Sequence, residues 1–126
     1  MPLVRISMNA GRADAVRAAI SDAVHQAMVD TIKVPADDKF QILTEHGKGQ
    51  VVYDANYLGV SRTDGIVVIQ ITLNAGRTVE MKKALYARTA QLLQDKAGVR
   101  AEDVVISLTE VTKENWSFGN GAASYA

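Results

Sequence analysis

The sequence predicts an α+β fold built from two βαβ repeats, which form a four-stranded mixed sheet with both helices on one face. The phrase "ISMNAGR" at residues 6–12 returns as "ITLNAGR" at residues 71–77, a shift of 65 positions. The match keeps its register without a gap from residue 4 to residue 45. Each copy has the pattern strand, turn, helix, strand, and such crossovers are right-handed within one sheet.

The chain is expected to form one domain that covers residues 1–126. Its pseudo-repeats lie at about residues 2–48 and 67–113. A linker rich in Gly, Asn and Asp joins them, with a short strand candidate at residues 50–54. A chain of 126 residues is long enough to bury one hydrophobic core.

The first copy begins with a strand over residues 3–8, "LVRISM", which is rich in branched aliphatic side chains. "NAGR" at residues 9–12 turns the chain, because glycine permits unusual backbone angles. Apolar residues from Val16 to Met28 then recur at helical spacing. The helix ends before "VPADD", and "KFQILTE" at residues 39–45 forms the second strand.

The second copy repeats this order. Its first strand, "IVVIQITL" at residues 66–73, is apolar almost throughout, so we expect it to be buried on both faces. Thr78 is placed to cap the helix that follows, and "VVISLTE" at residues 104–110 forms the last strand. Two helices on one face leave the other face of the sheet open, and an oligomer would cover it.

Composition excludes several classes of function. The chain has 14 basic and 14 acidic residues, so no positive excess indicates a nucleic-acid partner. No cysteine is present for disulfides, thiol catalysis or thiolate metal sites. The two histidines lie far apart, so we expect no metal site. No apolar run could span a bilayer and no signal peptide is evident, so we expect no membrane partner and a cytoplasmic protein.

The copies differ first at Pro2, which corresponds to Val67. Removal of Met1 would leave Pro2 with a free secondary amine. Such an amine can act as a base, a nucleophile or a cation, depending on its pKa. Proline is common at the second position, so this residue alone is weak support for catalysis.

Arg12 and Arg77 each stand at the start of a helix, where a guanidinium can bind a carboxylate. Both copies keep this arginine, so it could equally stabilise the turn. Asp38 and Asp103 also recur, and a structural cap is the alternative for both. Asp38 differs because Asp37 stands beside it, and adjacent carboxylates favour a shifted pKa.

An aromatic and glycine-rich stretch, "NWSFGNGAASYA", follows the last strand of the second copy only. Trp116, Phe118 and Tyr125 could form the wall of an apolar pocket. Packing in a core or an interface is the alternative for aromatic residues near the end of a chain.

Several segments resemble the tautomerase superfamily, and within it most closely malonate semialdehyde decarboxylase and its relatives. They are "MPLVRI", "VPADDKFQIL", "LGVSR", "NAGRTVE" and above all "NWSFGNGAA". Together they span nearly the whole chain. The resemblance implies a homotrimer that needs no metal and no organic cofactor. The better-known decarboxylases carry two arginines in the turn before the second helix, whereas "NAGR" supplies only one.

The resemblance also implies roles for single residues. Pro2 resembles the catalytic amine, and Asp38 resembles the aspartate that acts with that amine or with water. Arg77 resembles the arginine that binds and polarises the substrate carboxylate. Trp116 and Phe118 resemble the hydrophobic wall.

Two further residues are candidates for substrate binding. Arg62 ends the segment "LGVSR" and could be a second carboxylate contact, although a solvated loop arginine is the alternative. Asn74 begins the turn that also carries Arg77.

The expected function is decarboxylation or hydration of a small 3-oxo acid such as malonate semialdehyde. This chemistry needs a protonated Pro2, which Asp38 favours by raising the amine pKa. A keto-enol tautomerase acting on a 2-oxo acid such as phenylpyruvate is the alternative and needs a neutral Pro2. A ligand-binding or oligomerisation module without catalysis is the second alternative.

Overall fold

A computed structural model describes residues 2–125 of the chain. Its elements in order are β1 (Leu3–Asn9), α1 (Asp14–Ile32), β2 (Gln41–His46), β3 (Val67–Asn74), α2 (Val79–Ala97) and β4 (Val104–Val111). The predicted α+β class and the two βαβ units are confirmed. The expected removal of Met1 concerns a residue outside the described range.

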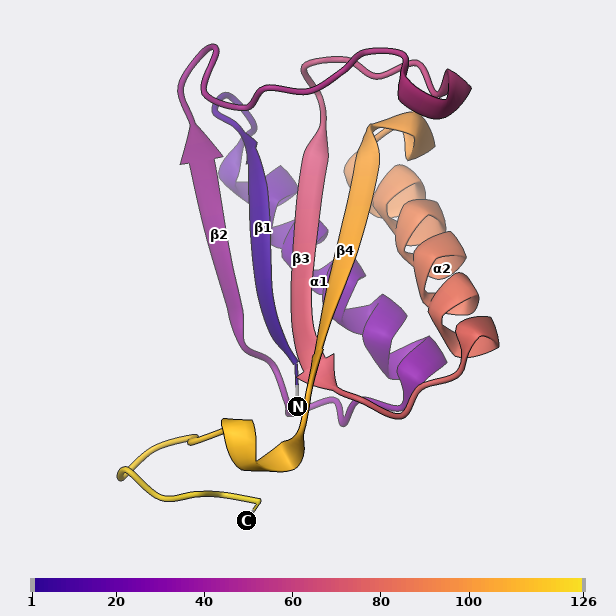
Figure 1. Cartoon of the computed structure of the whole chain (residues 1–126). Helices are drawn as coiled ribbons and strands as arrows, with labels where there is room; N and C mark the ends of the chain where they lie inside the picture. The colour runs from indigo at the N-terminus through magenta and orange to yellow at the C-terminus, as the bar shows by residue number, and fades with distance from the viewer. Residues whose placement is uncertain (1, 126) are drawn as a thin grey trace.

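The four strands form one mixed sheet in the order β2-β1-β3-β4 (Figure 1). β1 pairs in parallel with β2, and β3 pairs in parallel with β4. The antiparallel pair β1–β3 joins the two repeats, with Leu3 opposite Thr72 and Met8 opposite Val67. The start of β1 therefore lies beside the end of β3, and the two βαβ units run in opposite directions.

Both helices pack on one face of the sheet, as predicted (Figure 1). The core between sheet and helices is formed by the inward side chains of β1 and β3 and by the apolar faces of α1 and α2. Its largest fully buried members include Ile6, Met8, Ile20, Met28, Ile69, Ile71, Leu85 and Leu93. Burial of this apolar area is the main term that stabilises the fold.

The other face of the sheet is not covered by any element in residues 2–125. Along β3 the burial alternates, so that Ile69 and Ile71 are buried whereas Gln70 between them is exposed. The expectation that this strand is buried on both faces is therefore not met in the single chain. The open face consists of alternate residues that no helix of this chain reaches.

The two helices begin differently although their sequences are related by the repeat. Thr78 caps α2, because its Oγ1 accepts a hydrogen bond from the Met81 backbone N–H at 3.2 Å. This cap was predicted. The equivalent residue of α1 is Ala13, which has the same extended backbone but no side chain able to cap.

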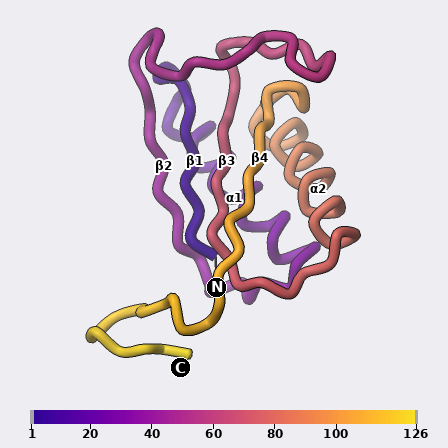
Figure 2. The backbone as a smooth tube through the Cα atoms, in the orientation of Figure 1, coloured from indigo at the N-terminus to yellow at the C-terminus, as the bar shows by residue number. Residues whose placement is uncertain are grey.

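The linker from Gly47 to Ile66 crosses the end of the sheet where β1 and β2 stop and β3 starts (Figure 2). The strand expected at residues 50–54 is wrong, since these residues pair with no strand. Side chains hold the segment instead: Gln50 accepts from the Gly47 N–H at 2.9 Å, and Tyr53 donates to Asp64 at 2.7 Å. No helix in the described residues is long and apolar enough to cross a membrane.

Candidate active site

One edge of the sheet gathers most of the candidate residues. Pro2 is buried and directly precedes β1, while Asp38 lies three residues before the parallel strand β2. Asn74 ends β3, and Trp116 follows β4 after a single 3-10 turn, Lys113–Asn115. Because β1 starts where β3 and β4 end, the first residues of the chain and its C-terminal segment lie at the same edge (Figure 1).

Asp38 is the most unusual polar group at this edge. Asp38 is only 6% exposed, and neither of its carboxylate oxygens has a hydrogen-bond partner among the described residues. Burial raises the pKa of Asp38 above 3.8, and the nearby Asp37 carboxylate raises it further. The positive charge of the chain's amino terminus, and to a smaller extent His25, oppose these effects on the pKa. An unpartnered buried carboxyl is costly for stability and is typical of functional sites.

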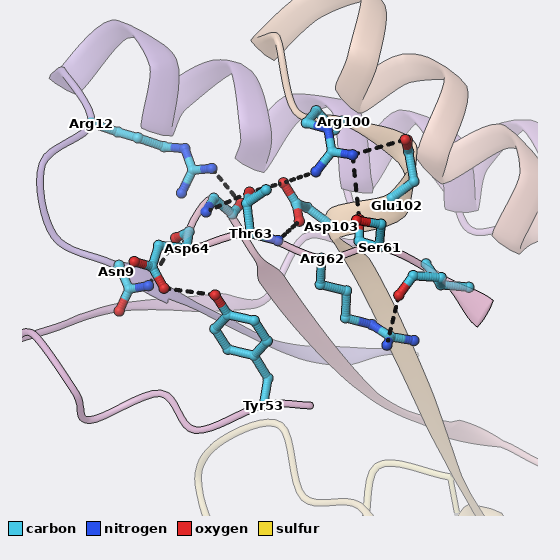
Figure 3. Close-up of polar contacts among 12 residues, drawn as sticks. Asn9, Arg12, Tyr53, Ser61, Arg62, Thr63, Asp64, Arg100, Glu102 and Asp103 are labelled. Atoms are coloured by element: carbon cyan, nitrogen blue, oxygen red, sulfur yellow. Dashed lines mark hydrogen bonds and ion pairs between the residues drawn. The ribbon is translucent and has the colours of Figure 1, made fainter. Parts of the chain in front are cut away.

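Asp103, its counterpart in the second repeat, is also buried but fully bonded (Figure 3). Its Oδ1 accepts from the Thr63 backbone N–H at 2.7 Å, and its Oδ2 accepts from the Thr63 hydroxyl at 2.6 Å. The Arg100 guanidinium lies 3.6 Å from the same oxygen. Asp103 therefore has a structural role, which was the alternative to a functional role for both Asp38 and Asp103.

The difference between the two aspartates follows from the sequence around them. Thr63 lies in the linker just before the second repeat, and among the described residues no side chain or N–H donates to Asp38 in the same way. Arg100 is replaced by Pro35, which has no charge and no donor. The same fold thus holds Asp103 by hydrogen bonds and leaves Asp38, among the described residues, without a hydrogen-bond partner.

Aromatic rings line the open face at this edge. Trp116 and Phe118 stack with centroids 5.1 Å apart, and Phe118 contacts Phe40 at 5.6 Å and Tyr125 at 5.7 Å. The indole Nε1 of Trp116 donates to Asn74 Oδ1 at 2.7 Å. Asn74 therefore fixes the orientation of the tryptophan, which ties the end of β3 to the C-terminal segment.

These rings border an apolar hollow of about 260 Å³, lined by Leu3, Phe40, Trp116, Ser117 and Phe118. Leu3 follows Pro2 directly. Neither Phe40 nor Leu3 was predicted from the sequence as a site residue. Their signal was available, since Phe40 lies two residues after Asp38 and points to the open face like Ile42.

Arg77 lies at the same edge but borders a different hollow, of about 320 Å³, together with Ile32, Lys33 and Met81. Its Nη1 donates to the Asn74 carbonyl at 3.0 Å and its Nη2 donates to the Ile32 carbonyl at 3.4 Å. In the single chain Arg77 thus stabilises the turn and the end of α1. The structure does not place it in the aromatic hollow.

Arg62 is not brought to this edge. It precedes β3, whose start lies at the opposite end of the sheet from Pro2. Its Nη1 donates to the carbonyls of Tyr57 and Asp54 at 3.1 and 3.2 Å, which fixes the linker. A substrate contact by Arg62 stays a prediction that the single chain does not favour.

A hollow of about 340 Å³ lies at that opposite edge, lined by Asn9, Ala10, His46, Lys48, Gly49, Val51 and Asp64. By the shift of 65 positions it is the counterpart of the Pro2 edge, with Val67 in place of Pro2 and Val51 in place of Trp116. It lacks the amine and the aromatic wall. No group of three or more potential metal-binding side chains occurs within residues 2–125.

Comparison with known sequences identifies relatives along the whole chain. A family model described as tautomerase enzyme matches residues 38–119, and a second with the same description matches residues 2–60. The probable tautomerase YusQ of Bacillus subtilis (strain 168) is 44% identical over 123 residues, which cover 98% of this chain and 97% of that protein. The probable tautomerase YrdN of the same organism is 31% identical over 125 residues, 99% of this chain and 96% of that protein.

Solved structures share the fold closely. FG41 malonate semialdehyde decarboxylase, inhibited by 3-bromopropiolate, superposes with a TM-score of 0.92 at 40% identity, over 98% of this chain and 93% of that one. Another malonate semialdehyde decarboxylase, with decarboxylase and hydratase activities, has a TM-score of 0.92 at 32% identity, over 98% and 95% of the chains. A fused 4-OT protein solved as a symmetric trimer has a TM-score of 0.79 at 27% identity, over 98% and 97%.

Proposed function

Because this chain belongs to the tautomerase family of enzymes, we propose that it decarboxylates or hydrates a small 3-oxo acid such as malonate semialdehyde. The catalytic amine is Pro2, made N-terminal by removal of Met1. No metal or organic cofactor takes part in the proposed reaction. The similarity to two malonate semialdehyde decarboxylases, at 32% and 40% identity, supports this choice of substrate class.

The observation that carries the proposal is the pair of Pro2 and Asp38. Asp38 is a buried carboxyl without a hydrogen-bond partner among the described residues, and a positive charge at the amino terminus opposes the rise of its pKa. Once Met1 is removed, Pro2 carries that charge. The interaction is mutual, since a carboxylate close to an amine stabilises the ammonium form. An ammonium group at Pro2 is the state that polarises a carbonyl oxygen, by donating a hydrogen bond or a proton to it.

In the decarboxylation, the bond between the carboxylate carbon and the α-carbon breaks. The electron pair moves into the carbonyl, whose oxygen takes a proton from the ammonium group, and CO2 leaves. The resulting enol then takes a proton at the α-carbon and returns its hydroxyl proton to the amine, which gives acetaldehyde. In hydration, water adds to the carbonyl carbon instead, and Asp38 is placed to orient it or accept its proton. In both reactions the carbonyl accepts the electron pair, and the cationic amine stabilises the charge that develops on its oxygen.

Arg77 binds the substrate carboxylate in this proposal. It has donors beyond the two that bond the Asn74 and Ile32 carbonyls, and it stands at the N-terminal end of α2. The aromatic hollow beside Pro2 provides a dry wall, against which departure of neutral CO2 from a carboxylate is favoured. In this proposal the substrate contacts both Arg77 and the aromatic hollow, which are separate hollows in the single chain.

A keto-enol tautomerase acting on a 2-oxo acid such as phenylpyruvate is the second candidate. The names of both Bacillus subtilis relatives favour it. A neutral Pro2 would remove a proton next to a carbonyl, and Arg77 would stabilise the enolate. The two candidates therefore differ in the protonation state of one nitrogen.

A homotrimer is the proposed assembly. The open face of the sheet supports it, and so does the fused 4-OT protein that was solved as a trimer. If subunits bury that face, β3 becomes buried on both faces of the sheet, as its apolar sequence predicts.

The first experiment measures the intact mass, because a retained Met1 would block the amine and exclude both enzyme candidates. ¹H NMR then follows 3-oxopropanoate and phenylenolpyruvate with the wild type, Pro2→Ala and Asp38→Asn. Asp37→Asn is the matched control, since Asp37 is the exposed neighbour of Asp38.

Under the proposal the wild type converts 3-oxopropanoate to acetaldehyde and CO2. Pro2→Ala and Asp38→Asn lose at least about a hundredfold in kcat/KM, while Asp37→Asn stays within about threefold. Full activity of either Pro2→Ala or Asp38→Asn would refute the mechanism. Conversion of phenylenolpyruvate alone would select the tautomerase.

A further inference from the structure

We propose that His25 is a positioning residue for Asp38, through a hydrogen bond from its imidazole to the backbone carbonyl of Ala36. This inference rests on the proposed function, because it assumes that Asp38 acts in the reaction. His25 lies on α1 and does not border the aromatic hollow or the Arg77 hollow.

The contact has a defined chemistry. His25 Nε2 lies 2.8 Å from the Ala36 carbonyl oxygen. A carbonyl oxygen can only accept, so Nε2 carries the proton. The accepting carbonyl lies two residues before Asp38, within a turn that the Asp38 N–H closes by donating to the Pro35 carbonyl at 3.0 Å. The imidazole therefore holds the turn that carries the carboxyl.

The other ring nitrogen is also unusual. His25 Nδ1 is buried and has no hydrogen-bond partner among the described residues, like both oxygens of Asp38. His25 is close enough to Asp38 to influence the pKa of its carboxyl. A purely structural histidine would normally satisfy both ring nitrogens or expose one to water. Within residues 2–125, this unsatisfied nitrogen lies on α1 and the unsatisfied carboxyl follows the Ala36 carbonyl that the same imidazole binds.

The segment from Ala36 to Gln41 has further polar links to the same helix. Lys39 Nζ contacts Asp22 Oδ1 at 2.8 Å. Gln41 exchanges hydrogen bonds with Ser21, accepting from its hydroxyl at 2.5 Å and donating to its carbonyl at 3.1 Å. Together with His25, these residues attach the Asp38 segment to one side of α1.

The second repeat has none of these links, although its backbone follows the same course. The residues equivalent to Ser21, Asp22 and His25 are Tyr86, Ala87 and Ala90. The partners Lys39 and Gln41 correspond to Val104 and Ile106. The fold therefore does not need the links. They occur only in the repeat where the aspartate lacks Thr63 and Arg100 to hold it.

Among the three links, the one from His25 acts on Asp38 most directly. The Lys39–Asp22 pair joins two exposed side chains, and such pairs contribute little. The Ser21–Gln41 bonds attach to the start of β2, three residues beyond Asp38. Only the His25 bond lies on the N-terminal side of Asp38 and inside its turn, where it limits the position of the carboxyl.

The test compares His25→Gln with His25→Leu in the full chain. Glutamine places an amide donor near the position of Nε2, whereas leucine keeps a similar bulk without a donor, and both residues suit a helix. We expect His25→Leu to lower kcat roughly tenfold with little change in KM, since misplacement of a catalytic group affects the chemical step. His25→Gln should recover most of the kcat. Asp22→Ala, on the same side of α1, is the matched control and should stay near wild type.

A second readout does not depend on activity. Hydrogen exchange of the Asp38 amide should become at least several-fold faster in His25→Leu and remain slow in His25→Gln. If His25→Leu fails to fold, His25→Asn replaces it, because its amide is too short to reach the Ala36 carbonyl.

The outcomes separate the two proposals. Wild-type activity in Asp38→Asn would refute the proposed function, while the exchange measurement would still test the contact. An inactive Asp38→Asn combined with wild-type kcat in His25→Leu would overturn the positioning role. Equal losses of kcat in His25→Gln and His25→Leu would overturn it as well, since the donor would then be irrelevant.

Discussion

The two equivalent aspartates should respond in opposite ways when each is changed to alanine. Asp103→Ala removes a carboxylate that accepts two hydrogen bonds from Thr63 at 2.7 and 2.6 Å and lies 3.6 Å from Arg100. Asp38→Ala removes a carboxylate of similar burial that accepts none within the described residues. The two substitutions delete the same atoms from equivalent positions, so the difference measures the partners alone.

Hydrogen bonds to a charged group each contribute about 1.5–3 kcal/mol. Thr63 is exposed, so water can replace part of what it loses, and the lower end of the range applies. Asp103→Ala should therefore lower the free energy of unfolding by about 3 kcal/mol. Asp38→Ala relieves the cost of a buried unpaired carboxyl and should be neutral or stabilising by about 1 kcal/mol.

The assay is thermal and denaturant unfolding of both variants and the wild type at one protein concentration, because the proposed trimer would make stability depend on concentration. For a chain of this length, a loss of about 3 kcal/mol lowers Tm by roughly 10 °C. Equal destabilisation by the two substitutions, or a larger loss in Asp38→Ala, would refute the account of Asp38 as an unpartnered group.

Three further predictions follow from single contacts. Burial raises the pKa of Asp38 in the folded state. The wild type should therefore become more stable relative to Asp38→Asn as the pH falls through that raised pKa toward 3.8. A difference in free energy of unfolding that stays constant from pH 7.5 to pH 4 in denaturant unfolding would contradict this. Trp116→Phe keeps an aromatic ring at this position but loses the hydrogen bond to Asn74. Steady-state kinetics should give a KM roughly fivefold higher with kcat nearly unchanged. An unchanged KM would argue against Asn74 as the residue that orients the aromatic ring. Thr78→Ala removes the cap of α2 and should lower the free energy of unfolding by about 1 kcal/mol, whereas Ala13→Thr should raise it by a similar amount. Denaturation midpoints that shift in the same direction for both variants would disprove the comparison of the two caps.

The repeat made much of the fold predictable. A gap-free shift of 65 positions located both helices and all four strands within a few residues, because each copy carries the same apolar periods and the same turn. Thr78 was found as a cap from its type and position alone. The strand expected at residues 50–54 failed because local side-chain bonds, such as the one from Gln50 to Gly47, decide the course of a linker.

The candidate site was predicted less completely. Pro2, Asp38, Asn74 and Trp116 were chosen from the differences between the copies and from a family resemblance, and they lie at one edge. Phe40 was missed because its orientation depends on the alternation along β2. Arg62 lies elsewhere, since its position depends on the antiparallel pairing of β1 with β3. His25 was considered only as a metal ligand, and its bond to the Ala36 carbonyl depends on how α1 lies against the turn before β2.

The sequence by itself determined the repeated βαβ unit and the residues at which its two copies differ, since apolar periodicity and turn residues act over short stretches of chain. The tertiary structure alone decided which of those differences meet in space. It paired the start of β1 with the end of β3, satisfied Asp103 through Thr63, and left Asp38 buried without a partner. Such contacts join residues that are distant along the chain, and only packing of the whole sheet against both helices brings them together.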